Sequence, residues 1–326
     1  MRRRSMAWAI LGTAGLFAIR RTASAAYPER PVTLVVPFAP GGGTDILGRL
    51  VADHLRGLLN QPFVVENRPG AGATIGASHV ARATPDGYTL LVGTSAELTI
   101  GPTLLSPQRY DPVKDFAPIA LLGSSANALL AHPGYSPRNV AELMRDAAAR
   151  PQGVSYASGG VGTGPHLSGE LLQAMTGMHL SHVPYRGSGP ALSDVMSGQV
   201  PLMFATLAAA LPVIRDGRVR ALAVTSATRS SELPDVPTVA EQGLPGYESV
   251  TWYAVLAPAG TPAEALTQLR GAIETVLRTP ALQARLRTLG IEAPAQQPDM
   301  PAMRARIHSE LLAWARLIRE NDIRAE

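Results

Sequence analysis

The stretch VVPFAPGGGTD, Val35 to Asp45, decides the fold of this chain. An apolar run that begins at Val32 ends in two prolines and three consecutive glycines, and an amphipathic pattern follows Thr44 and Asp45. A valine-rich run bounded by proline is typical of a buried strand. The apolar residues after Asp45 recur every three or four positions, which predicts a helix with one apolar face. Strand, glycine loop and helix together indicate a sheet covered by helices.

The same alternation of strand and helix continues on both sides of this stretch. Apolar segments at 62–67 and 88–95 read as further strands, with a short helix predicted over 73–83 between them. This order favours a parallel sheet with helices on its faces. A second unit of the same kind follows, with strands predicted near 153–158, 180–185, 200–206 and 219–226. The chain is therefore expected to be an α/β protein with two similar units.

Two long apolar stretches lie outside this alternation, at 116–133 and at 249–260. Each is long enough to run from one unit into the other. Two such crossings predict a discontinuous first domain, residues 26–123 and 251–326, with residues 124–250 inserted as the second domain. Trp252 and Tyr253 at the second crossing could stack on a ligand, but packing at the hinge is the favoured expectation.

Local capping patterns mark where several helices begin. Ser136 before a proline is the expected N-cap of a helix over 140–149, and Thr261-Pro262-Ala263-Glu264 is the expected capping box of another. Asp299 is the expected start of the last helix. These predictions depend only on residues close in sequence.

The first 25 residues have the layout of a secretory signal peptide. Three arginines precede an apolar run from Met6 to Ile19, and Ala23-Ser24-Ala25 fits a cleavage site. Whether export follows the general or the twin-arginine route stays open. Removing these residues takes five arginines from a chain of formal charge +4 and leaves a charge of −1. A nucleic-acid-binding domain needs a basic surface, so we expect no nucleic-acid partner.

Two glycine loops are the candidate binding elements. The second lies in VSYASGGVGTGPHLSGELL, Val154 to Leu172, and also stands between a strand and a helix. The N-terminus of a helix presents unpaired N–H groups and a partial positive charge, and glycine lets a ligand approach them closely. Two such loops, one in each unit, predict an anion-binding cleft between the units.

Other chemistries find little support in the sequence. The chain has no cysteine, no phosphate-binding loop with a lysine and no serine nucleophile elbow. His179 and His182 would face opposite sides of a strand, so no metal or other cofactor is expected. His166 could donate to a ligand, cap its helix or act as a general base, and Asp45 could cap its helix or accept from a ligand amine. Arg186 could pair with a second ligand carboxylate or lie in a surface ion pair.

Several motifs together resemble a known family. YPERPVTLVVPFAPGGGTDILGRL, VVENRPGAGATIGASHVARATPDGYTLLVGT, YASGGVGTGPHLSGELL and HVPYRGSGPAL resemble the Bug-type (TctC-like) periplasmic solute receptors of tripartite tricarboxylate transporters. The resemblance implies two α/β domains that close on a small carboxylate, as in type II-like periplasmic binding proteins. It also implies that the loops over 38–45 and 158–166 hold the ligand, and that a large and a small membrane subunit receive it.

We therefore expect a non-enzymatic, monomeric periplasmic protein that delivers a dicarboxylate, tricarboxylate, aromatic acid or acidic amino acid to a transporter. The alternatives are a periplasmic co-receptor that signals to a sensor kinase, and a hydrolase or lyase that uses His166. The expected ligand-binding residues are Phe38, Ala39, Gly41, Gly42, Thr44, Asp45, Thr94, Ser95, Ser158, Gly159, Gly162, Thr163, His166, Tyr185, Arg186, Gly187 and Phe204.

Overall fold

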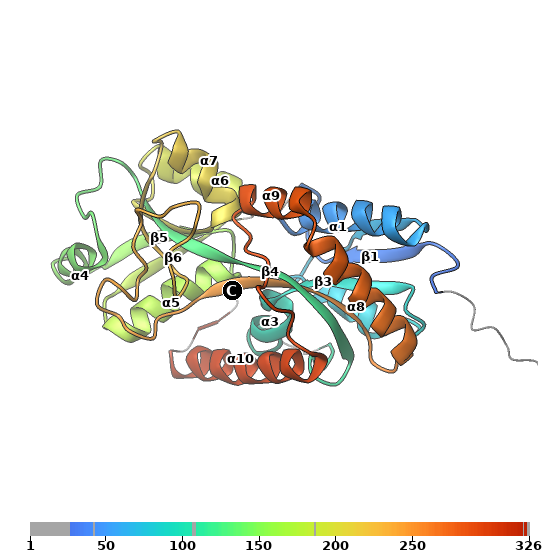
Figure 1. Cartoon of the computed structure of the whole chain (residues 1–326). Helices are drawn as coiled ribbons and strands as arrows, with labels where there is room; N and C mark the ends of the chain where they lie inside the picture. Colours follow the sequence, from blue (N-terminus) through green and yellow to red (C-terminus); the bar gives the residue numbers. More distant parts are fainter. Residues whose placement is uncertain (1–26, 42, 106–108, 186, 322, 325–326) are drawn as a thin grey trace, which may run out of the picture.

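The computed structural model describes residues 27–324 of the 326-residue chain, except positions 42, 106–108, 186 and 322. The predicted signal peptide, Gly42 and Arg186 therefore lie outside the described residues. The rest of the chain forms two lobes, and strand β4 (Phe116–Ala131) runs through both (Figure 1). The strand order is β2-β1-β3-β9-β4-β7-β5-β6, and β8 also pairs with β4.

The first lobe is a sheet with helices on both faces. Strand β1 pairs in parallel with β2 and β3, and β9 pairs antiparallel with β3 and with the first part of β4. Leu34 of β1 faces the core under α1 and α8, and Val35 faces the core under α2 and α10. Burial on both faces explains why the strand is apolar throughout. The elements are β1 (Val32–Val36), α1 (Gly43–Leu59), β2 (Phe63–Asn67), α2 (Thr74–Ala81), β3 (Thr89–Thr94), β9 (Val250–Pro258), α8 (Ala263–Leu277) and α10 (Met300–Glu320).

The second lobe repeats this plan. Strand β5 pairs in parallel with β6 and β7, while β4 pairs antiparallel with β7 and β8. Helices α6 and α7 cover one face of the sheet, and α4 and α5 cover the other. The elements are α4 (Val140–Ala148), β5 (Val154–Ser158), α5 (Gly164–Thr176), β6 (Leu180–Pro184), α6 (Ser188–Met196), β7 (Leu202–Thr206), α7 (Leu207–Arg215) and β8 (Arg220–Val224).

The two apolar stretches that we expected to cross between the units are β4 and β9, which pair with each other from Phe116 to Ala126. The domain boundaries proposed from the sequence fall inside these two strands and stay a prediction. A third segment reaches the same place after α9 (Pro280–Thr288): Glu292 exchanges two backbone hydrogen bonds with Ser124, of 2.8 and 2.9 Å. A Cβ on Gly123 would lie 2.7 Å from the Glu292 carbonyl oxygen, so this close approach depends on glycine.

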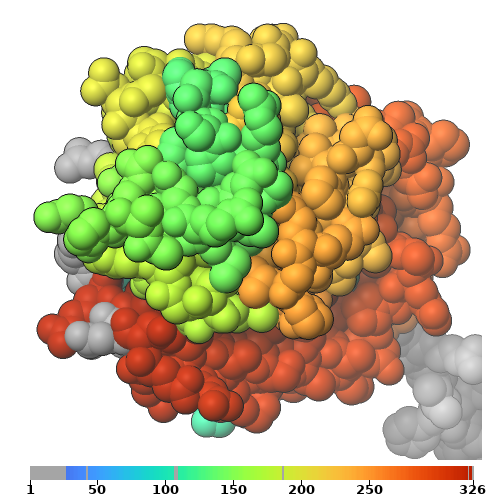
Figure 2. Space-filling model, turned by 90° about the vertical axis from the view of Figure 1, so that its left-hand side faces the viewer, coloured from blue at the N-terminus to red at the C-terminus, as the bar shows by residue number. Residues whose placement is uncertain are grey.

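The C-terminal helix α10 links the two lobes from one side. Its apolar face packs on the first sheet through Met303 and Ile307, and its last turn packs through Ile318 against Leu167 of α5. Figure 2 shows α10, in red, lying along the lower edge of the second lobe. Among the described residues, no helix is long and apolar enough to cross a membrane.

Two of the predicted caps are wrong. Helix α4 begins at Val140, and its N-cap is Asn139, whose side chain accepts the Glu142 N–H at 2.8 Å. Helix α8 begins at Ala263, and the Thr261 hydroxyl instead donates to the Pro258 carbonyl at 2.8 Å. At α4 a second polar residue, Asn139, is the cap in place of Ser136. At α8 the Thr261 hydroxyl is engaged in the preceding turn and does not cap the helix. The predicted cap at Asp299 is confirmed, since its carboxylate accepts the Ala302 N–H at 2.7 Å.

Candidate functional site

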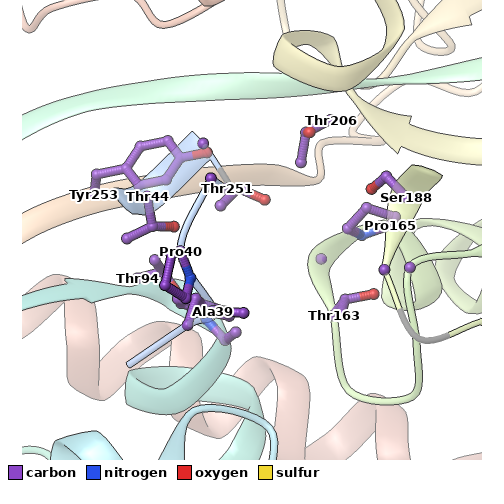
Figure 3. Close-up of a pocket in the computed structure, with 17 residues that line it drawn as sticks. Ala39, Pro40, Thr44, Thr94, Thr163, Pro165, Ser188, Thr206, Thr251 and Tyr253 are labelled. Carbon is purple, nitrogen blue, oxygen red and sulfur yellow. Dashed lines mark hydrogen bonds between the residues drawn. The ribbon is translucent and has the colours of Figure 1, made fainter. Parts of the chain in front are cut away.

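A pocket of about 470 Å³ lies between the two lobes. Residues after β1 and β3 form one wall and residues after β5, β6 and β7 form the other, with Thr251 between them (Figure 3). All of these segments follow the carboxyl ends of strands, where open α/β sheets bind ligands. None of the described residues that line the pocket has a charged side chain. They are Phe38, Ala39, Pro40, Gly41, Gly43, Thr44, Thr94, Ala96, Gly159, Thr163, Gly164, Pro165, Gly187, Ser188, Thr206, Thr251 and Tyr253.

Asp45 holds the first glycine loop from behind. Its buried carboxylate accepts the Gly41 N–H at 2.9 Å and the Asn67 side-chain amide at 2.9 Å, and it pairs with Arg49. Gly41 has φ +84°, a conformation that glycine adopts without strain. Burial opposes ionisation of Asp45, but the Arg49 guanidinium and these hydrogen bonds hold its pKa below the usual value. The loop is thus fixed without using the first N–H groups of α1, which begins at Gly43.

His166 does the same for the second glycine loop. Its Nδ1 accepts the N–H of Gly162, which has φ +77°, at 3.1 Å. Because Nδ1 is the acceptor, the ring carries its proton on Nε2, which lies 3.7 Å from Glu170 Oε1. Burial and the stacked His182 ring lower the pKa of His166 to about 3, so the imidazole is neutral at neutral pH. In both lobes, then, an acceptor four residues after a glycine with positive φ takes that glycine's amide.

The second loop is also fixed by Ser158. Its hydroxyl lies 2.7 Å from His182 Nε2 and accepts the Gly160 N–H at 3.1 Å. Burial lowers the pKa of His182 to about 4, so this ring is neutral as well. Ser158 has no exposed surface, and its hydroxyl is occupied within the loop.

The floor of the pocket comes from the crossing strand β9. Thr251 and Tyr253 both line it, and burial raises the pKa of Tyr253 to about 12, so the phenol stays protonated. The buried Thr251 Oγ1 has no hydrogen-bond partner among the described residues. A Cβ on Gly164 would lie 2.6 Å from that oxygen, so the glycine at the start of α5 lets the helix approach the floor. The floor therefore brings no charged side chain to the pocket, and the Thr251 Oγ1 atom itself is covered.

Eight of the residues expected from the sequence line this pocket. They come from both glycine loops, from the end of β3 and from the segment after β6, as the family resemblance implied. Their direct contact with a ligand stays a prediction. They are Phe38, Ala39, Gly41, Thr44, Thr94, Gly159, Thr163 and Gly187.

Seven others lie outside the lining, and their surroundings explain why. Asp45, Ser158 and His166 hold the loops as described above. Gly162 belongs to the second loop, but its N–H bonds His166, and a Cβ there would lie 3.2 Å from Leu104 of α3. Ser95 is buried beneath η1 (Ala96–Ile100), a short π-helical turn that leads into α3 (Gly101–Leu104).

Tyr185 and Phe204 are the remaining two. The Tyr185 hydroxyl donates to Asp194 at 2.5 Å, and burial together with Asp194 raises its pKa to about 12. Phe204 is fully buried and packs edge-on against Tyr156. The pocket residue of that strand is Thr206, because only the last residue of a parallel strand reaches the ligand-binding edge.

The sequence reasoning missed other lining residues as well. Gly43, Gly164 and Pro165 begin the two helices, and the rule that helix N-termini face an anion would have found them. Thr206 is the last residue of β7 and Ser188 follows β6, two strands whose carboxyl ends were already predicted. Thr251 and Tyr253 had no such signal, because the pattern of β9 indicates only burial. The hinge packing expected of Tyr253 stays a prediction. The other missed residues are Pro40 and Ala96.

The geometry does not favour a catalytic role for His166. A general base must be within hydrogen-bond reach of the proton that it removes. The His166 side chain is buried, and its accepting nitrogen is taken by the Gly162 amide. His166 and His182 do stack, at 4.0 Å between ring centres, but no group of three potential metal ligands occurs among the described residues.

Comparison with known proteins agrees with this geometry. Residues 47–323 match the family described as "Tripartite tricarboxylate transporter family receptor". The chain is 37% identical to Protein BugT of Bordetella pertussis over 311 residues, which are 95% of this chain and 94% of BugT. Among solved structures, R. palustris Rpa4515 with adipate has a TM-score of 0.83 and 37% identity, covering 91% of this chain and 99% of that one. MatC (Rpa3494) from Rhodopseudomonas palustris with bound malate has a TM-score of 0.80 and 34% identity, covering 90% and 100%.

Proposed function

Because the chain belongs to the family of tripartite tricarboxylate transporter receptors, we propose that it is an exported solute-binding protein that captures a small carboxylate between its lobes. One observation carries this proposal: the N-termini of α1 and α5, one from each lobe, border a single pocket. Each helix N-terminus carries a partial positive charge. At α5 the Gly164 N–H is the first-turn amide that remains for a ligand, because Pro165 has no N–H and the His166 N–H bonds the Thr163 hydroxyl. A carboxylate held by both would keep the lobes together.

The chemistry of the lining suits such a ligand. Hydroxyl groups and backbone amides can surround a carboxylate without an arginine or lysine, and Figure 3 shows the Thr44 hydroxyl directed toward the opposite wall. The volume of about 470 Å³ lies in the range of small-molecule sites. The body of the ligand would rest against Thr251 and Tyr253, and the Tyr253 hydroxyl can bond a polar substituent or a second carboxylate through water.

Delivery to a membrane transporter is the second part of the proposal. The relatives whose structures hold adipate and malate show that this fold accommodates ligands with two carboxylates. For the present chain we propose the same general class, with the closed form, as a monomer, recognised by the membrane subunits of a tripartite tricarboxylate transporter in the periplasm.

A thermal-shift panel tests the binding step. Malate, adipate, succinate, benzoate and glutamate would be compared with their uncharged amides, and with phosphate and a sugar. A ligand that binds only the folded protein adds roughly 2.7 kcal/mol of stability at 100 times its Kd. We expect stabilisation by at least one carboxylate and none by its amide. Equal shifts with acid and amide, or no shift with any acid, would contradict the proposal.

A pair of matched variants then locates the site. Thr44→Val keeps the side-chain volume and removes a hydroxyl in the pocket, whereas Thr267→Val makes the same change on exposed α8, where the hydroxyl bonds Ala263. Losing a hydrogen bond to a charged group costs about 1.5 to 3 kcal/mol, so Thr44→Val should raise Kd about tenfold or more. Thr267→Val should leave Kd unchanged. Calorimetric titration measures both.

A further inference from the structure

The end of β3 is built differently from the two glycine loops. The Glu97 side chain is fully buried. Its Oε1 accepts the Thr94 N–H at 2.5 Å, and its Oε2 accepts the Thr94 hydroxyl at 2.6 Å. The Ala96 N–H in turn donates to the Thr94 hydroxyl oxygen at 3.1 Å. The Thr94 N–H and hydroxyl are therefore both directed to the Glu97 carboxyl group. Thr94 and Ala96 form the pocket wall here, and Glu97 lies behind them.

This carboxyl group is not balanced by a cation. No ion pair among the described residues involves Glu97, and β3 and α3, which pack against it, carry no titratable side chain. From the segment after α3, the Tyr110 hydroxyl donates to the Glu97 main-chain oxygen at 2.5 Å.

Helix α10 also packs against this turn, and its charged groups are engaged elsewhere. Arg304 donates to the Val113 and Phe116 carbonyls, Arg306 pairs with Glu310 and Arg316 with Glu320. His308 and Arg319 are exposed. Burial raises the pKa of Glu97 to about 7. The acid can therefore change its protonation state near neutral pH.

We propose that Glu97 is a positioning residue of the pocket that takes up one proton when a carboxylate binds, so that capture depends on pH. This inference rests on the proposed function, because it requires the ligand to be an anion. Two anions separated by one hydroxyl group in a dry site repel each other, and the one able to take a proton from solvent does so.

The exchange also changes what Thr94 offers. While Glu97 is ionised, the Thr94 hydroxyl must donate its proton to Oε2, because a carboxylate can only accept. Once Glu97 is protonated, its own O–H can donate to Thr94 Oγ1, and the Thr94 hydroxyl proton is free to turn toward a ligand oxygen. One proton enters from solvent, and the number of hydrogen bonds around Thr94 rises by one when the ligand is present.

The first test is the pH dependence of affinity. The probe is malate or adipate, whichever gives the larger shift in the carboxylate panel. If the protonated form is the one that binds, apparent Kd equals the intrinsic Kd divided by the protonated fraction. Kd should then rise about tenfold between pH 6 and pH 8. Saturable binding with the same Kd at both pH values overturns this inference and leaves the proposed function standing, whereas no binding of any carboxylate overturns both.

Two variants assign the effect to Glu97. In Glu97→Gln the amide can accept the Thr94 N–H and donate to the Thr94 hydroxyl, as the protonated acid would, so Kd should stay within about twofold from pH 6 to pH 8. Glu170→Gln is the matched control, since Glu170 is also buried but bonds Tyr156 and does not line the pocket. It should keep the tenfold change. A slope retained in Glu97→Gln, or lost in Glu170→Gln, contradicts the inference.

A measurement on the unaltered protein covers the case in which Glu97→Gln fails to fold. Binding enthalpy at pH 7 would be measured in two buffers of different ionisation enthalpy. With a pKa near 7 the free site is about half protonated at this pH, so about half a proton should enter for each ligand bound. Uptake of no proton overturns the inference.

Discussion

Gly41 and Gly162 occupy equivalent places in the two lobes, each four residues before the side chain that accepts its amide. Both have φ values in the left-handed region, and both acceptors, Asp45 and His166, are buried in the first turn of a helix. An acceptor at this place fixes the loop without using the helix N-terminus. If these loops bind a ligand as proposed, their conformation is set before the ligand arrives, which reduces the entropy lost on binding.

Asp45 offers a direct test of this preparation. Asp45→Ala removes an acceptor for both Gly41 and Asn67, and losing such partly exposed hydrogen bonds costs about 0.5–1.5 kcal/mol each. Asp45→Asn retains one acceptor oxygen and should lose less. Urea unfolding gives the stabilities, and titration with a panel ligand gives the affinities. Equal stability of Asp45→Ala and the natural protein would show that the first glycine loop keeps its conformation without Asp45.

The paired histidines predict a loss of stability in acid. His166 and His182 have pKa values of about 3 and 4 in the folded protein, below the ordinary value of about 6.5. As pH falls below 6.5, the unfolded chain binds protons that the folded chain does not, so the free energy of unfolding decreases. The raised pKa of Glu97 acts in the opposite direction between about 4.5 and 7.

A variant isolates the histidine contribution. The free energy of unfolding of the natural protein and of His182→Gln would be measured at pH 7 and pH 5 by urea denaturation. The variant has one titrating ring fewer, so its stability should fall less on acidification. An equal or larger fall in the variant would mean that His182 is not held neutral by the fold.

Helix starts show what local sequence can and cannot fix. Ser136 and Asn139 are both good caps by residue type, and the structure uses Asn139. Asn139→Ala should therefore cost about 1 kcal/mol, while Ser136→Ala, at an exposed position outside the helix, should change stability by less than about 0.5 kcal/mol. Urea midpoints of the two variants decide the matter, and the reverse order would restore Ser136 as the cap.

Strands, helices and glycine loops could be predicted because their signals lie within about ten neighbouring residues. The run from Val35 to Asp45 carries a strand, a loop and a helix start in one place. The choice of Phe204 over Thr206 failed for a different reason, since register within a strand decides which residue reaches the pocket. Thr251 and Glu97 could not be found at all. Their roles depend on contacts with Gly164 and Thr94 that only the folded chain creates.

The contact between the lobes provides a test of closure. A Cβ at position 43, at the start of α1, would lie 3.8 Å from the Cβ of Ala208 on α7 in the other lobe. This separation matches that of disulfide-linked cysteines, and the chain has no cysteine of its own. The double variant Gly43→Cys, Ala208→Cys should form an intramolecular disulfide under mild oxidation.

Ligand should speed this reaction, because a carboxylate held by both lobes favours the closed form. Gel mobility after oxidation and thiol blocking follows the rate with and without the panel ligand. The two single variants are the controls and should give no intramolecular product. Failure of the double variant to oxidise would show that the lobes do not approach as closely in solution.

The pocket floor lies where we expect the two lobes to pivot. Thr251 and Tyr253 belong to β9, which pairs with β4 through the middle of the molecule. We expect a ligand seated there to contact the pivot as well as both lobes, so that its length and shape set the angle between the closed lobes. If the proposed function holds, a membrane subunit that senses this angle also senses which ligand is bound.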